Sequence, residues 1–188
     1  YLSNALQKYA NLNVDLRPYI PSQDALQVSD AILKNLADPS GRLVTITLRT
    51  SSQQRERNSN LQTWYSVYRS LKAEGFEVLV IPDFEDFISN REYARHPWPI
   101  FYPAMFDLGI RLSLYSRAFQ NMGVLNGVLV PLFHSTFPYL IFKPHVESVP
   151  VTSLAWLRKV FGIGYGENFW WSGVGQELAW ADDNNDTV

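Results

Sequence analysis

The sequence predicts an α/β domain of Rossmann-like type, in which helices flank a parallel β-sheet. Two short runs, residues 43–48 and 76–81, are rich in aliphatic residues and almost free of charge, which is typical of strands covered on both faces. A polar loop and an apolar stripe with helical spacing separate the two runs. This strand–loop–helix–strand order predicts a βαβ unit with parallel pairing and a right-handed crossover.

The chain is long enough for one domain with a sizeable core. It has 188 residues, of which 46 % are hydrophobic and 14 % are aromatic. We expect a single domain with a helical lead-in at residues 1–41, an α/β core at 42–162 and a Gly- and Trp-rich segment at 163–188. Because the sequence begins with Tyr1 instead of Met, we expect it to be part of a longer chain.

The elements of the first half follow from capping and stop signals. Ser22 is expected to cap a helix, and the Asp-Pro-Ser-Gly run at 38–41 is expected to end it. After the first strand, Asn58 or Ser59 is expected to cap the next helix, and Gly75 stands where a glycine commonly follows a helix. The apolar stripe of that helix consists of Leu61, Trp64, Tyr65, Tyr68 and Leu71.

The second half continues the alternation of strands and helices. Residues 128–134 fit either a short helix or a continued strand. The other elements are expected in this order: a loop at 83–103, a helix at 107–122 ended by Gly123, a strand from Val124 toward Gly127, a strand at 139–142, and a helix capped by Thr152 or Ser153 and ended at Gly162.

Composition argues against several classes of protein. The net charge of −2 gives no electrostatic reason to expect nucleic acid as a partner. The absence of cysteine excludes disulfides and thiol chemistry, and the three histidines match no metal-binding spacing, so no metal is expected. There is no run of about 18 apolar residues, so we expect no transmembrane segment and a cytoplasmic location.

The strongest candidate site is the polar loop at residues 49–59. It joins the carboxyl end of a strand to the amino end of a helix, and open α/β sheets bind ligands at that edge. Free N–H groups at a helix start attract phosphate, and Asn58 and Ser59 lie there. Arg49 and Arg55 are suited to bidentate hydrogen bonds with diphosphate oxygens. The alternative is a solvated loop whose arginines pair with nearby glutamates.

Three further positions are candidates for binding or catalysis. Arg111 borders the buried stripe of its helix, so it is expected to pair with a ligand or with Asp107. Asn126 and Gly127 follow a strand, where a glycine lets a ligand approach the backbone, although Asn-Gly is also an ordinary turn. His134 is the candidate general base because it lies nearest to this turn, and a hydrogen-bonded core histidine is the alternative.

Other motifs have both a ligand-binding and a purely structural interpretation. Residues 83–86 include three carboxylates that suit either a divalent cation or a solvated acidic turn. The glycines of 162–166 have G-x-G-x-G spacing and follow a helix, unlike the dinucleotide fingerprint. Trp170, Trp171 and Trp180 are suited to stacking on a sugar or base, or to packing the chain end onto the core.

Several short sequence patterns follow one another along residues 43–183. A strand ends in T-L-R, an R-N-S-N loop follows at 57–60, the next helix bears Trp64, and the second strand ends in I-P-D at 81–83. Later runs are D-L-G-I-R at 107–111, N-G at 126–127 and Q-E-L-A-W-A-D-D at 176–183. Together they resemble a group of uncharacterised bacterial glycosyltransferase-like proteins.

The resemblance implies a GT-B architecture of two Rossmann-like domains, of which this chain would be the C-terminal, nucleotide-sugar-binding half. It implies polysaccharide biosynthesis, in which the sugar of a nucleoside diphosphate donor is transferred to a glycan acceptor. No cofactor beyond that co-substrate is expected, because basic side chains and a helix dipole can stabilise the leaving diphosphate. The donor side would be formed by Arg49, Arg55, Asn58, Ser59, Asn126 and Gly127.

The sequence departs from the implied architecture in two respects. It has room for one Rossmann-sized domain, so an acceptor domain would lie outside this chain, and it has no E-x₇-E pair for the donor sugar. The alternative function is therefore a non-catalytic carbohydrate-binding or assembly module.

Overall fold

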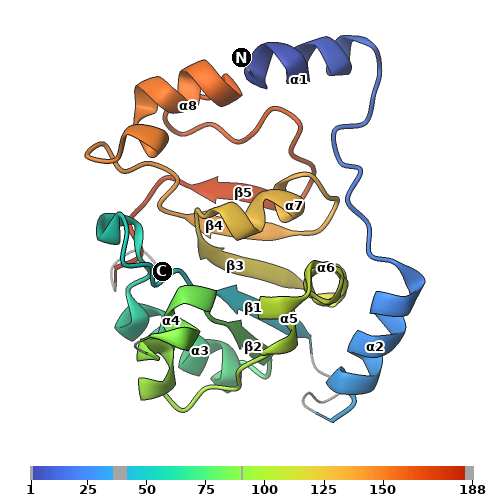
Figure 1. Cartoon of the computed structure of the whole chain (residues 1–188), viewed down its shortest axis with the longest axis vertical. Coiled ribbons are helices and arrows are strands. Elements are labelled where there is room, and N and C mark those ends of the chain that lie inside the picture. The colour runs from blue at the N-terminus through green and yellow to red at the C-terminus, as the bar shows by residue number, and fades with distance from the viewer. Residues whose placement is uncertain (1, 36–41, 90, 185–188) are drawn as a thin grey trace.

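A computed structural model of the chain describes residues 2–35, 42–89 and 91–184. Five parallel strands form one sheet in the order β2-β1-β3-β4-β5 (Figure 1). The strands are β1 (Leu43–Thr47), β2 (Glu77–Ile81), β3 (Gln120–Val124), β4 (Tyr139–Phe142) and β5 (Gln176–Ala179). The predicted Rossmann-like α/β fold is confirmed, since helices flank this parallel sheet.

Helices cover both faces of the sheet. They are α1 (Leu2–Asn11), α2 (Gln23–Leu33), α3 (Leu61–Ala73), α4 (Phe84–Ile88), α5 (Pro103–Phe106), α6 (Leu108–Arg117), α7 (Val130–Phe133) and α8 (Leu154–Phe161). The 3₁₀ turns in the described ranges are η1 (Arg55–Arg57), η2 (Glu92–Arg95), η3 (Gly127–Leu129) and η4 (Pro150–Thr152). Of the two structures expected for residues 128–134, a short helix or a continued strand, the structure has the helix, α7.

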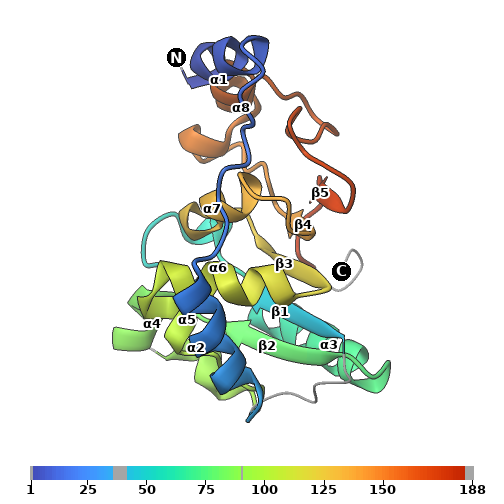
Figure 2. The ribbon, with the colours of Figure 1, turned by 90° about the vertical axis from the view of Figure 1, so that its right-hand side faces the viewer.

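The N-terminal segment runs along the outside of the domain. Helix α1 packs against α8, and α2 packs against α6, so the chain between them passes from one end of the domain to the other (Figures 1 and 2). Ser22 caps α2 as predicted, because its hydroxyl accepts a hydrogen bond from the Ala25 N–H at 3.2 Å. The helix stop predicted at residues 38–41 lies outside the described residues.

The predicted βαβ unit is present. Strands β1 and β2 pair in parallel along their whole length, and α3 crosses between them. Asn60 caps α3, instead of Asn58 or Ser59, because its side chain accepts the Thr63 N–H. The helix buries Trp64 completely against the sheet.

The predicted helix at 107–122 is longer than the helix that the structure has there. Helix α6 ends at Arg117, and Ala118 turns the chain so that Gly123 lies inside β3. A Cβ on Gly123 would lie 2.6 Å from the Thr47 carbonyl oxygen. Glycine therefore serves here to let β1 and β3 approach, and does not end a helix.

The predicted loop at 83–103 contains regular structure. Asp83 caps the short helix α4, its carboxylate accepting the Glu85 N–H at 3.0 Å. Asp86 is buried, and its carboxylate accepts backbone N–H groups of Glu92 and Tyr93, each at 3.1 Å. This carboxylate therefore organises the start of η2.

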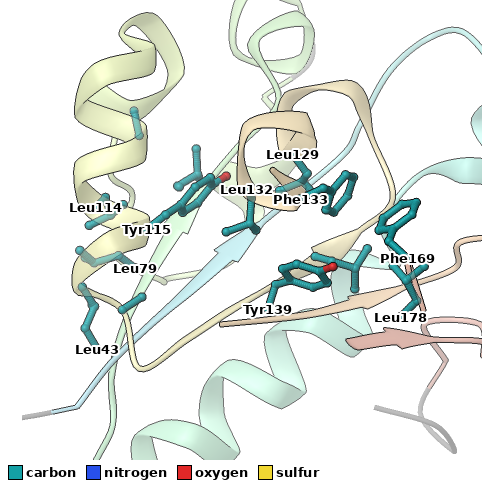
Figure 3. Packing of buried hydrophobic residues seen from close by; sticks show 14 of the residues in the cluster. Leu43, Leu79, Leu114, Tyr115, Leu129, Leu132, Phe133, Tyr139, Phe169 and Leu178 are labelled. Atoms are coloured by element: carbon teal, nitrogen blue, oxygen red, sulfur yellow. The ribbon is translucent and has the colours of Figure 1, made fainter. Parts of the chain in front are cut away.

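The main core lies between the sheet and helices α6, α7 and α8. Figure 3 shows Tyr115 of α6 and Phe133 of α7 in this core, with the Phe133 ring near the rings of Tyr139 of β4 and Phe169. The ring centroid of Phe133 lies 5.5 Å from that of Tyr139 and 5.2 Å from that of Phe169. Ile163, Phe169 and Trp171 of the Gly- and Trp-rich segment thus pack in the core, and the segment also supplies β5, an element that periodicity does not reveal.

Candidate functional site

The carboxyl edge of the sheet brings two loops together between β1 and β3. The chain passes from β1 to β2 on one side, whereas β3 lies on the other side of β1, so this is the topological switch point. Ligands of open α/β sheets bind in the crevice at such a point. Arg57, in the loop after β1, reaches across and donates from Nη2 to the Leu125 carbonyl oxygen at 3.2 Å.

The loop after β1 is folded around Arg49. This guanidinium donates from Nη2 to the Gln53 carbonyl oxygen at 2.9 Å and from Nη1 to the Asn58 side chain. Asn58 in turn donates to the Ser51 carbonyl oxygen at 2.8 Å, and the Ser59 hydroxyl accepts the Arg49 N–H at 2.9 Å. Three residues predicted to bind the donor therefore shape the loop from within.

Burial and a neighbouring carboxylate fix this loop further. Burial lowers the pKa of Arg49, although the charges of Asp83 and Glu85 oppose the change. Glu85 accepts hydrogen bonds from the Ser51 hydroxyl at 2.7 Å and the Ser52 N–H at 2.9 Å. Hydrogen bonds from Ser52 and Ser51 lower the pKa of Glu85, so its anionic form holds the loop to α4.

The other two arginines of the loop differ in orientation. Arg55 is exposed, whereas Arg57 is half-buried and lines a cavity of ≈ 320 Å³. Gln54 Oε1 accepts a hydrogen bond from Arg57 Nη1 at 2.8 Å, and burial lowers the pKa of Arg57. The sequence pattern indicates the loop as a whole, and only the fold distinguishes Arg57 as the arginine that reaches the cavity.

Asn126 lines the same cavity and is the most informative residue of the site. It is 8 % exposed, and neither its Nδ2 nor its Oδ1 has a hydrogen-bond partner among the described residues. A buried amide without partners is costly and rare in a folded protein. The amide of Asn126 is therefore suited to a ligand that enters the cavity, and Gly127 lies beside it in the cavity wall.

Aromatic side chains form much of the rest of the cavity wall. The Phe169 and Trp171 rings are stacked with centroids 4.7 Å apart, and the His134 ring stacks on Trp171 at 5.1 Å. His134 Nδ1 is hydrogen-bonded to the Leu16 carbonyl oxygen at 2.8 Å, which fixes the ring. The complete lining is Arg57, Leu125, Asn126, Gly127, Val130, Phe133, His134, Val151, Thr152, Trp156, Phe161, Phe169 and Trp171.

Arg111 does not line this cavity. It is buried on α6, and its Nε donates to the Ala104 carbonyl oxygen at 2.6 Å. Asp107, its predicted partner, instead caps α6 by accepting the Ile110 N–H at 2.8 Å. Of the predicted site residues, the cavity therefore joins Asn126, Gly127 and His134.

Neither a metal cluster nor a membrane span is found in the described ranges. Within them, no three His, Cys, Asp or Glu side chains are arranged to hold a metal ion. In the same part of the chain, every helix is too short or too polar to cross a bilayer.

Comparisons with known proteins agree with the fold. No family model matches the chain, and no curated protein matches it in sequence. A crystal structure described as glycosyl transferase family 9 from Veillonella parvula superposes with a TM-score of 0.59 at 8 % identity. The match covers 85 % of this chain but 40 % of that one, so the chain spans well under half the length of the similar structure. The chain has a glycosyltransferase-like α/β fold.

Proposed function

We propose that the chain binds a nucleoside diphosphate sugar at the carboxyl edge between β1 and β3. It would act as the C-terminal, nucleotide-sugar-binding half of a GT-B-type glycosyltransferase that transfers the sugar to a glycan acceptor. The observation that carries the proposal is the buried amide of Asn126, which has no hydrogen-bond partner in the part of the chain that the structure describes and lines a cavity together with Arg57. The glycosyltransferase-like fold supports it.

Each part of the cavity wall has a role in this proposal. The aromatic residues pack on the base, since apolar pockets with a few polar groups suit such ligands. Asn126 offers a planar donor and acceptor pair, which suits a base edge or a ribose. Arg57 attracts the diphosphate, and its positive charge stabilises the negative charge that develops as the diphosphate leaves. His134 stays the candidate base, because it lines the same cavity.

Titration calorimetry with UDP, GDP and ADP tests the proposal. We expect one of the three to bind, and we expect Arg57→Ala to weaken that binding at least tenfold. The matched control is Arg55→Ala, which removes an exposed arginine two residues away in the same 3₁₀ turn and should change the affinity less than twofold. The proposal fails if none of the nucleotides binds, or if the two variants weaken binding equally.

A non-catalytic carbohydrate-binding module is the second candidate. A cavity at the ends of β4 and β5 favours it, because Trp180 and Tyr165 line that cavity together with carboxylates. A transfer assay distinguishes the candidates once the partner domain is supplied: the second candidate requires glycan binding without any nucleotide-dependent transfer.

A further inference from the structure

A second cavity opens at the same edge of the sheet, beyond β4 and β5. Its volume is ≈ 370 Å³. Glu56 lines this cavity, whereas its neighbour Arg57 lines the first one, so the two cavities flank the single turn η1. The other residues of its wall are Lys143, Pro144, His145, Val146, Tyr165, Trp180, Ala181 and Asp182.

Two aromatic rings are held in place at this cavity. Trp180 Nε1 donates to the Glu167 carbonyl oxygen at 2.8 Å, and the Tyr165 ring centroid lies 5.2 Å from that of Trp180. Tyr165 stands between Gly164 and Gly166 in a turn whose Gly166 has a φ of +83°. The Gly164 N–H donates to the Glu167 side chain at 2.6 Å. The glycine-rich motif thus presents Tyr165, which is 64 % exposed, beside Trp180.

The charges of the cavity favour a neutral ligand. Lys143 Nζ lies 2.6 Å from Asp183 Oδ1 and 3.0 Å from Asp182 Oδ1, and it donates to the Asn58 carbonyl oxygen at 3.0 Å. Because that cation is engaged by two carboxylates, it offers little attraction to a phosphate. Glu56 adds an exposed carboxylate at the rim, which would repel a diphosphate.

We propose that this second cavity binds a neutral saccharide. The C–H face of a sugar ring would pack on Trp180 and Tyr165, and its hydroxyl groups would donate to the carboxylates of Glu56 and Asp182. Carboxylates accept hydrogen bonds only, so they match the hydroxyl donors of a sugar. This saccharide would be the glycan acceptor of the transfer reaction. That assignment rests on the proposed function, whereas the binding of a saccharide does not.

Saccharide titration in the absence of nucleotide tests this site. The probes are glucose, galactose, mannose, N-acetylglucosamine, cellobiose, lactose and chitobiose. Their binding is measured by calorimetry and by saturation-transfer NMR. We expect at least one of them to bind. Tyr165→Ala and Trp180→Ala should each weaken that binding at least fivefold. Trp170→Ala is the matched control, since Trp170 is also partly exposed but lies outside this cavity, and it should change the affinity less than twofold.

Two results would overturn the inference. One is that no saccharide of the panel binds, and the other is that Tyr165→Ala binds as tightly as the unmodified chain. Tyr165 is exposed, so its removal should leave the fold intact, which circular dichroism would check. Saccharide binding that UDP, GDP and ADP leave unchanged supports two separate cavities, and competition by a nucleotide contradicts them. Nucleotide binding without saccharide binding would refute this inference and leave the proposed function standing.

Discussion

Replacing Asn126 by leucine should stabilise the chain while it removes nucleotide binding. The two side chains have the same number of heavy atoms, and the backbone of Asn126 is extended, with φ −150° and ψ 169°, which leucine also adopts. Both amide atoms are buried without partners among the described residues. A buried unsatisfied polar group costs about 1–3 kcal/mol, so the free energy of unfolding should rise by about 2 kcal/mol. For a chain of this size, that raises Tm by roughly 6 °C.

Asn121 provides a matched control in β3. It is also buried, but its Nδ2 donates to the carbonyl oxygens of Tyr115 and Pro138, and its Oδ1 accepts the Thr45 hydroxyl at 2.7 Å. Asn121→Leu removes these three hydrogen bonds and leaves the buried Thr45 hydroxyl without its acceptor, whereas the two carbonyl oxygens keep backbone donors. At roughly 1 kcal/mol for each bond, the variant should lower the free energy of unfolding by about 3 kcal/mol. Urea denaturation of both variants gives the two signs, and calorimetry with the nucleotide that binds gives the functional loss.

A rise in the free energy of unfolding for Asn126→Leu and a fall for Asn121→Leu would support an amide of Asn126 that the fold leaves unsatisfied. If Asn126→Leu lowered the free energy of unfolding by as much as Asn121→Leu, the amide of Asn126 would have partners within the fold. The cavity would then lack the polar group that the proposed ligand needs. Unchanged nucleotide affinity in Asn126→Leu would exclude a role of this amide in nucleotide binding even if the variant were more stable.

Three further predictions concern the sheet and its edge. Gly123→Ala should lower the free energy of unfolding by about 3 kcal/mol in urea denaturation, because its Cβ would meet a β1 carbonyl oxygen at 2.6 Å. Gly127→Ala is the control: a Cβ there would have no heavy atom within 4 Å, so the free energy of unfolding should change by less than about 1 kcal/mol. Burial raises the pKa of Tyr139 to about 12, so its contribution to stability is complete below about pH 10 and is lost as the pH rises toward 12. Urea denaturation from pH 9 to 12 should show this fall in the free energy of unfolding, and the fall should be smaller in Tyr139→Phe. Lys143→Met should lower the free energy of unfolding by about 3 kcal/mol, because it leaves the carboxylate of Asp183 buried and without its cation, and equal stability of the variant would contradict this.

The sequence predicts the first βαβ unit well because its signals are local. The strand run of 43–48 is β-branched, uncharged and buried on both faces, the stripe of α3 has helical spacing, and Gly75 takes a positive φ of 82° after the helix. None of these depends on residues far away in the chain. The same signals fail at Gly123, where the glycine is needed because another strand lies against it, a contact that spacing does not show.

The candidate site could be predicted only as a place. Strand ends and the arginine loop indicate the carboxyl edge between β1 and β3, where Arg57 and residues 125–127 contribute to the wall of the cavity. The rest of the wall comes from α7, α8, the loop after β4 and the segment before β5. Which arginine faces the cavity depends on how the loop folds: Arg49 is bound by the loop's own carbonyl oxygens, Arg55 is exposed, and Arg57 reaches Leu125. The aromatic wall comes from Phe169 and its neighbours, which are distant in sequence from the loop.

The side-chain amide resonance of Asn126 in a ¹H–¹⁵N spectrum reports directly on whether a nucleotide binds at this residue. The resonance is assigned by its disappearance in Asn126→Leu, and it is followed while UDP, GDP or ADP is added. Direct binding of the nucleotide at the amide predicts a shift that saturates with the same Kd as calorimetry. A nucleotide that binds by calorimetry while this resonance stays unmoved would contradict the placement of the donor in the cavity that Arg57 and Asn126 line.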